Sequence, residues 1–169
     1  YRLLYNLLAL LLLWPPLWLT IRQSGEPLWH WPGWIAWPVL ILALVGFMVS
    51  LRWYDGMEFI GLRALRGEAN AGATLVLSPL HRFVRHPWYA LGLAVLWTRD
   101  LDAAWLLAAL VISLYVWVGI RFEERKLIRL FGERYRAYQR RVPALLPWPG
   151  RSLTAAEAAA WMRPDADAG

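Results

Sequence analysis

The segment over residues 82–89 gathers side chains that could bind a charged ligand where a polar stretch meets an apolar run. It reads Arg82-Phe83-Val84-Arg85-His86-Pro87-Trp88-Tyr89. Proline suits the first turn of a helix, because no N–H is needed there. The segment therefore predicts a helix that begins at Pro87, with His86 at its positive end, where free N–H groups favour a ligand carboxylate. The alternative is that the arginines and the tyrosine anchor the chain at a membrane interface and His86 is a solvated cap.

A second group consists of two adjacent carboxylates, Glu123 and Glu124. On a helix over 120–131, at about 100° per residue, both fall within an apolar arc. The members of that arc are Ile120, Leu127, Ile128, Leu130 and Phe131, and the opposite face carries Arg121, Arg125 and Arg129, with Lys126 at its edge. Carboxylates on an apolar stripe are costly unless they are compensated. Their partners must therefore come from another segment or from a ligand.

Two interpretations of these glutamates stay open from the residues alone. In the first, they form ion pairs with Arg82 or Arg85 across the helices. In the second, they bind a cationic or hydroxyl-rich ligand at the edge of a membrane. S-adenosylmethionine is such a ligand, since it carries a sulfonium, an ammonium and a ribose diol. Gly119, one turn before Glu123, would leave room beside that carboxylate.

The composition indicates that membrane-spanning helices position these two groups. Of the 169 residues, 59% are hydrophobic, only 18% are charged and 13 are Trp, whereas soluble domains hold about 45–50% apolar residues. Four apolar runs, over about 3–21, 34–51, 86–98 and 103–121, are the predicted spans. We therefore expect an all-α fold, a polytopic integral membrane helical bundle with a cytosolic C-terminal amphipathic helix. One transmembrane domain is expected over 1–150, followed by a polar, flexible tail over 151–169.

The distribution of Lys and Arg predicts the orientation of the spans. The 52–85 connection carries five of these residues and the segment 121–151 carries nine, whereas the two short connections carry one each, Arg22 and Arg99. Basic connections stay on the cytoplasmic side. Both basic blocks, and any site between them, should therefore face the cytoplasm. In a bacterium the membrane would be the inner membrane.

Several function classes are disfavoured by what the chain contains. It has no Cys, which excludes thiolate nucleophiles and Cys-ligated metals. The net charge of +6 belongs to residues that flank apolar runs, so lipid headgroups explain it better than nucleic acid does. No ionisable residue lies in the middle of a span, which argues against a small transporter. His30 and His81 are expected at the interface, and no metal site is expected.

The two motifs together resemble the signature of a membrane methyltransferase superfamily. They are Arg85-His86-Pro87-Trp88-Tyr89 and, about thirty residues later, Glu123-Glu124. The superfamily contains the isoprenylcysteine carboxyl methyltransferases and the phospholipid N-methyltransferases. The stretch 131–143, from Phe131-Gly132-Glu133-Arg134-Tyr135 to Val142-Pro143, is typical of bacterial members. Upstream, Tyr1-Arg2-Leu3-Leu4-Tyr5-Asn6, Tyr54-Asp55 and Phe59-Ile60-Gly61-Leu62-Arg63 resemble the NnrU-like and methanethiol S-methyltransferase-like branch.

The resemblance implies an enzyme that transfers a methyl group from S-adenosyl-L-methionine. The pocket would lie between the last two spans and the C-terminal helix, and the matching cofactor-binding positions are Arg85, His86, Tyr89, Glu123 and Glu124. Many members have Gly two residues after the motif Tyr, where this chain has Leu91 followed by Gly92. No residue is assigned as a general acid or base, because methyl transfer depends mainly on positioning.

The acceptor and the activity itself are not determined by these motifs. A pocket at the bilayer boundary suits a prenylated thioether acid, a phospholipid amine or a small thiol, and the branch resemblance favours the thiol. The competing interpretation is a non-catalytic membrane scaffold or accessory protein that retains the fold. It predicts ion pairs from Glu123 and Glu124 to Arg82 and Arg85, with no cavity beside Gly119. Members of the branch generally have another apolar segment before the part that corresponds to Tyr1, and the sequence lacks an initial Met. Residues upstream of Tyr1 are therefore expected.

Overall fold

The structure is a computed structural model that describes residues 25–52 and 78–162, with single positions before them at Leu11, Trp14, Pro15, Trp18, Thr20 and Arg22. The predicted span over 3–21 and most of the 52–85 connection lie outside these residues. In the described part the fold is all-α, as predicted, and the only β pairing is two isolated bridges, Trp29 with Leu101 and Trp148 with Arg151.

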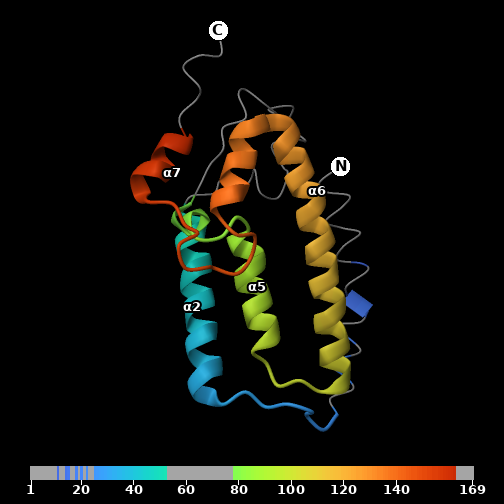
Figure 1. Ribbon diagram of the computed structural model, residues 1–169. Coiled ribbons are helices and arrows are strands. Elements are labelled where there is room, and N and C mark those ends of the chain that lie inside the picture. Colours follow the sequence, from blue (N-terminus) through green and yellow to red (C-terminus); the bar gives the residue numbers. More distant parts are fainter. Residues whose placement is uncertain are drawn as a thin grey trace.

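Three long helices lie side by side in chain order (Figure 1). They are α2 (Gly33–Leu51), α5 (Pro87–Trp97) and α6 (Ala103–Arg141). A 3₁₀ turn, η1 (Pro79–Arg82), precedes α5, and a short helix, α7 (Ala155–Met162), follows α6. The range of α6 includes a kink at Gly132, and the predicted amphipathic segment over 133–141 is the helical arm that follows this kink.

Two of these helices, α2 and α6, are long and apolar enough to cross a membrane. In each, only 17% of the most apolar 18-residue window is buried. A core helix of a soluble protein would bury most of such a stretch. The outward side chains of α2 include Trp37, Ile41, Leu42 and Met48, all exposed. The apolar surface of these helices is therefore available to lipid, while α5, with 11 residues, is short for a full crossing.

A close contact between α2 and α5 explains the Leu that replaces the family glycine. A Cβ at Gly46 would lie 2.8 Å from Cδ1 of Leu91, so the glycine makes the space that this leucine fills. Next to it, the rings of Phe47 and Trp88 meet edge to face with centroids 5.5 Å apart. Leu91 therefore packs between helices.

The two short connections meet at the end of the helices away from the basic residues (Figure 1). Leu28 N donates to Leu101 O (2.7 Å), and Leu101 N donates to Trp29 O (2.9 Å). Asp102 caps α6 by accepting a hydrogen bond from Trp105 N at 2.6 Å. The two connections with one arginine each thus share one end of the molecule, as the Lys/Arg distribution requires.

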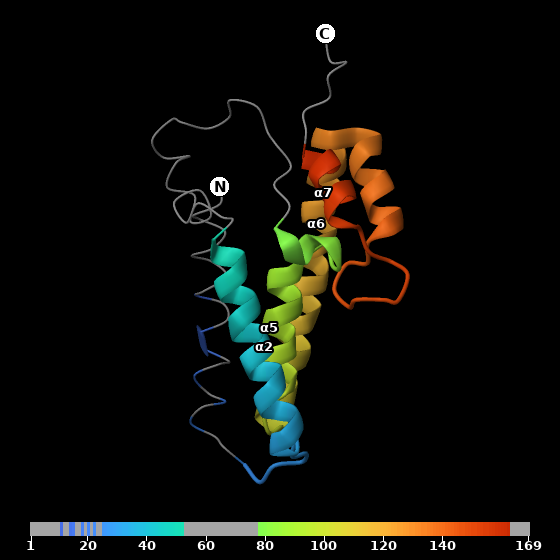
Figure 2. The same ribbon diagram turned by 90° about the vertical axis from the view of Figure 1, so that its left-hand side faces the viewer.

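At the opposite end α6 reverses its direction at Gly132 (Figures 1 and 2). This residue has φ 54° and ψ −132°, a conformation that is open to glycine and strained for other residues. The predicted break at Gly132 is therefore present, and it produces a helical hairpin. Its returning arm, residues 133–141, packs Tyr135 and Tyr138 against Leu127 and Ile128 of the outgoing arm.

The segment after Arg151 is not the flexible tail that its Ala-rich, polar sequence suggests, at least as far as residue 162. Leu153 and Ala158 are buried in one cluster with Tyr135, Tyr138 and Val142, and Trp161 packs against it. Thr154 N donates to Glu157 Oε2 at 2.7 Å and begins α7. This segment therefore packs against the returning arm through Leu153, Ala158 and Trp161. Residues 163–169 lie outside the described part.

The stability of the hairpin should depend on Gly132 at its turn. Gly132→Ala is expected to lower the free energy of unfolding by about 1–3 kcal/mol, because alanine is strained at this φ and ψ. Gly25→Ala is the matched control, since a Cβ there meets nothing within 4 Å and its φ is not in the left-handed region. Thermal unfolding in detergent measures both, and equal melting temperatures for the two variants would contradict the prediction.

Candidate functional site

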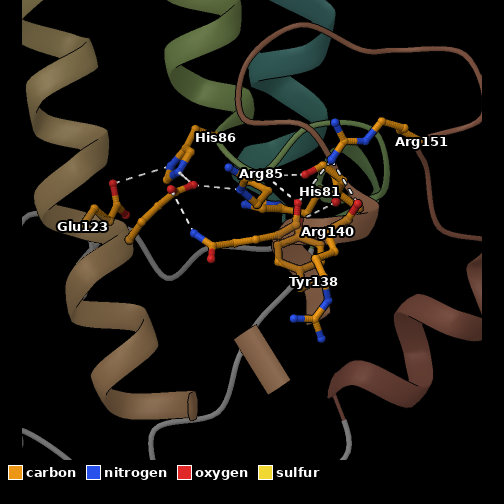
Figure 3. Close-up of polar contacts among 10 residues, drawn as sticks. His81, Arg85, His86, Glu123, Tyr138, Arg140 and Arg151 are labelled. Carbon is orange, nitrogen blue, oxygen red and sulfur yellow. Dashed lines mark hydrogen bonds and ion pairs between the residues drawn. The ribbon is translucent and has the colours of Figure 1, made fainter. Parts of the chain in front are cut away.

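Backbone hydrogen bonds tie the Arg85-His86 motif to the chain that follows α6. Arg85 N donates to Pro143 O (2.8 Å) and His86 N donates to Ala144 O (3.0 Å). Pro87 is the first residue of α5, as the motif predicts, and His86 occupies the N-cap position. The start of α5 is thereby held against the base of the hairpin, where His86 faces Glu123 (Figure 3).

Glu124 joins the three parts of the site. Its Oε1 accepts a hydrogen bond from Arg85 Nε at 2.7 Å and lies 3.2 Å from His86 Nε2. Its Oε2 accepts a hydrogen bond from Gln139 Nε2 at 3.0 Å. The side chain is only 13% exposed, so both oxygens are occupied within the protein. The carboxylate is compensated by another segment, as its place in an apolar arc requires.

Electrostatics keep this carboxylate ionised. Burial alone would raise the pKa of Glu124, but the hydrogen bonds from His86 and Arg85 and the charges of both residues outweigh it. The pKa of Glu124 is thereby lowered to about 2. The group therefore stabilises the fold at neutral pH as a permanent negative charge.

Arg85 is equally committed to the protein. Besides Glu124, its guanidinium donates to the backbone carbonyl of Gln139 at 3.1 Å and to that of Val142. Its side chain is 11% exposed. The arginine holds the C-terminal end of the returning arm. This agrees with the first interpretation given above, in which the glutamates form ion pairs across the helices. Arg82 does not contact the glutamates; its Nε donates to Leu153 O at 3.0 Å.

Glu123 is the carboxylate of the pair that remains open. Its Oε2 lies 3.6 Å from Nδ1 of His86, and its side chain is 42% exposed. The His86 ring, 5% exposed, thus lies between the two carboxylates and stacks on Tyr89, with centroids 5.7 Å apart. The five predicted site residues therefore come together, with Glu124 and Arg85 inside and Glu123 and Tyr89 at the surface.

The space around Glu123 is open on the side of α6. A Cβ built on Gly119, one turn before Glu123, would meet nothing within 4 Å, and the same is true of Gly92 on α5. Two surface hollows, of about 350 and 310 Å³, lie elsewhere, and neither is lined by His86, Glu123 or Glu124. Within the described residues, Glu123 therefore lies at the surface, beside His86.

Gln139 is a member of this site that the sequence reasoning missed. The hairpin turn at Gly132 places it opposite Glu124, fifteen residues earlier. Its only sequence signal was its position after the predicted break, on the face shared with Tyr135 and Tyr138. A glutamine in an amphipathic helix usually faces water, so its type alone gave no indication.

A buried polar chain around His81 supports the same region from the side of α2. Ser78 N donates to Nδ1 of His81 at 3.1 Å, and Ser78 Oγ lies 2.8 Å from the same atom. Ser50, at the end of α2, has its Oγ 3.5 Å from that of Ser78, and Tyr138 donates to His81 O at 2.6 Å. His81 is buried, not interfacial as expected. Burial, followed by the charge of His86, lowers the pKa of His81 to about 4.

The described elements define an all-α protein with two helices of membrane-spanning length and a polar cluster where α5 begins. The chain belongs to the family described as "Protein of unknown function (DUF1295)", which matches residues 2–142. It is 36% identical over 155 residues to methanethiol S-methyltransferase 2 of Bradyrhizobium diazoefficiens, covering 87% of this chain and 58% of that relative. No solved structure matches the chain.

Two further relatives carry a similar name. The methanethiol S-methyltransferase of Mycobacterium tuberculosis is 33% identical over 162 residues, 89% of this chain and 64% of the relative. That of Pseudomonas deceptionensis is 30% identical over 146 residues, 83% of this chain and 55% of the relative. The predicted resemblance to the methanethiol S-methyltransferase-like branch is confirmed. The chain spans less than two thirds of the length of each of these relatives.

Glu124 and Glu123 should differ in their contribution to stability. Glu124→Gln removes the counter-charge of a mostly buried arginine and is expected to cost about 3 kcal/mol. Glu123→Gln, at an exposed position, is expected to cost well under about 1 kcal/mol. Urea unfolding in detergent, followed by tryptophan fluorescence, measures both. A Glu123 variant as unstable as the Glu124 variant would contradict this division.

His81 should make stability fall on mild acidification. Its pKa is lowered in the folded protein, so below about pH 6.5 the unfolded chain binds the proton first, and stability falls until about pH 4. The loss can reach about 3 kcal/mol. His81→Asn, whose side-chain oxygen can accept from Ser78 N, should flatten this slope. The exposed His30→Asn should keep it, and a slope unchanged in the His81 variant would refute the assignment.

Proposed function

We propose that this protein is an S-adenosylmethionine-dependent membrane methyltransferase whose acceptor is a small thiol. The observation that carries the proposal is the juxtaposition of the exposed Glu123 carboxylate, His86 and the N-terminus of α5 beside the open flank at Gly119. The names of the relatives support the reaction class, since three proteins with 30–36% identity are named methanethiol S-methyltransferases. The chain matches less than two thirds of each relative, so the thiol acceptor of those proteins is only proposed for this chain.

The chemistry of the side chains fits S-adenosylmethionine. Glu123 can accept hydrogen bonds from its ammonium or ribose hydroxyls and offset the charge of its sulfonium. The positive end of α5 suits its carboxylate. Tyr89, stacked on His86 and partly exposed, offers an aromatic surface to a cationic or planar group. Arg85 and Glu124 contribute by holding His86 and Glu123 in place.

The cofactor, when bound, supplies an electrophilic methyl group on a positively charged sulfur. An acceptor thiol would take this methyl group on its sulfur and release its proton to water or to a neighbouring base. The cysteine side chain has a pKa of about 8.5 and a simple alkyl thiol is a weaker acid, so such an acceptor is mostly protonated at neutral pH and proton removal would add to the rate. His86 and Tyr89 are the nearest groups that can take part, but alignment of the two sulfurs with the methyl group is the larger contribution.

We propose that the protein is an integral membrane protein with this site on the cytoplasmic side. The basic residues of the described chain gather around the start of α5 and the hairpin, and the two connections with one arginine each lie at the other end. In a bacterium this orientation corresponds to the inner membrane. A site at that level would be reached by acceptors that partition into lipid and by a cofactor from the cytosol.

A non-catalytic scaffold is the second candidate, and one observation favours it. Arg85 and Glu124 form the ion pair that the scaffold interpretation predicts, at 2.7 Å and with little exposure. One observation favours the enzyme instead: Arg82 does not pair with Glu123, and the Glu123 carboxylate keeps 42% of its side chain exposed.

Binding of S-adenosylmethionine to the purified protein in detergent, measured by calorimetry, tests the proposal. Glu123→Gln is expected to weaken binding at least tenfold without lowering the melting temperature, because the lost charge faces the ligand. Glu133→Gln is the matched control, an exposed glutamate on the same helix, 75% exposed and paired with Arg136. It should bind as the wild type does.

The acceptor is then tested with methanethiol, a prenylated cysteine and a phospholipid amine. Dimethyl sulfide and S-adenosylhomocysteine formed in equal amounts with methanethiol would establish the thiol reaction. Product only with another acceptor would keep the enzyme class and reject the thiol. No binding of S-adenosylmethionine to folded wild type would reject the enzyme and favour the scaffold.

A further inference from the structure

The outward face of α6 is apolar up to residue 118 and basic immediately after it. Its apolar part consists of exposed side chains at helical spacing: Leu107, Leu110, Val111, Leu114, Trp117 and Val118. The same face continues with Arg121 and Arg125, one turn apart, and both are exposed. The change from apolar to basic falls at the level where α6 leaves the predicted span.

A hollow of about 310 Å³ lies on this face and is lined by Trp117, Val118, Arg121, Phe122 and Arg125. Arg121 lies over the Trp117 ring at 4.8 Å and Arg125 over the Phe122 ring at 5.8 Å. These cation–π contacts hold the guanidinium groups at the rim without neutralising them. Among the described residues, no carboxylate forms an ion pair with either arginine, and Glu123 and Glu124 project elsewhere.

We infer that this hollow binds the headgroup of an anionic phospholipid. Two unneutralised guanidinium groups one turn apart can both donate to one phosphate, which is the geometry that arginine favours. The apolar row that ends at Trp117 and Val118 provides the path for the acyl chains. Charge complementarity and continuity with the lipid-exposed surface of α6 both favour a lipid of the membrane over a soluble anion or a protein partner. The inference rests on membrane insertion, and not on methyl transfer.

This site is distinct from the proposed catalytic surface. The arginines point away from the arc that holds Glu123 and Glu124, as the helical wheel predicts and the exposures confirm. A lipid bound here would fix the depth of α6 in the bilayer, so the residues one turn further along would stay at the headgroup level. Its loss should therefore leave S-adenosylmethionine binding in detergent unchanged.

Native mass spectrometry of the full-length protein, released from detergent with equal phosphatidylglycerol and phosphatidylcholine, tests the inference. The wild type should retain phosphatidylglycerol in preference, and Arg121→Gln/Arg125→Gln should reduce that preference about tenfold or more. Arg136→Gln/Arg140→Gln is the matched control, with the same spacing and charge change on the exposed returning arm. It should keep the preference.

Three results would overturn the inference: no lipid preference in the wild type, equal loss in both double variants, or displacement by millimolar inorganic phosphate. Displacement by phosphate would indicate a simple anion site, in which the apolar row does not contribute to binding. If the double variant does not fold, Arg125→Gln alone should lower the preference by a smaller factor. The wild-type preference should also fall as ionic strength rises, and a preference independent of salt would contradict the role of the arginines.

Discussion

The fold at the basic end depends on one buried charge, the carboxylate of Glu124. A carboxylate with little access to water is stable only if its oxygens find donors. Here the donors come from two places that are distant in sequence: the start of α5, through Arg85 and His86, and the returning arm of α6, through Gln139. The hydrogen bonds of this one group therefore tie the start of α5 to the returning arm of the hairpin.

This constraint also separates the two adjacent glutamates by role. Glu124 points to the inside of the hairpin, and both of its oxygens contact protein groups. Glu123, about 100° further round the helix, faces the gap beside Gly119 and keeps 42% of its side chain exposed. The pair of neighbouring carboxylates thus places one buried, hydrogen-bonded group and one exposed group on a single turn of helix. His86 connects them, because its two ring nitrogens face one carboxylate each.

The sequence predicted those parts of the structure that follow from local periodicity. The helical wheel placed Glu124 on the packed face, and Pro87 marked the start of α5, because these depend only on residues within a turn or two. The same wheel put Glu123 on that face, but its side chain is 42% exposed. The break at Gly132 was also foreseen, but its direction was not, since the reversal depends on φ and ψ values that glycine permits without requiring them. Gln139 was missed for that reason, as its partner becomes a neighbour only after the reversal.

The C-terminal segment and His81 show a second limit. Alanine is compatible with a flexible tail and with a packed helix, and only contacts from Leu153 and Trp161 to the returning arm decide between them. The surroundings of His81 include Tyr138, 57 residues later, which donates to His81 O, and Ser78, which links the histidine to Ser50 of α2. Long-range packing of this kind leaves no periodic trace in the sequence.

The commitment of Arg85 limits which ligands the surface can recognise. An arginine that was free to pair would attract an anion, but this one already donates to Glu124 and to two backbone carbonyls of the returning arm. The charge that remains exposed is that of Glu123, which is negative and lies beside an aromatic ring pair formed by His86 and Tyr89. Such a surface favours a ligand with a positive centre next to a planar group. A sulfonium nucleoside has both features, so the electrostatics of this surface are compatible with the cofactor that we propose.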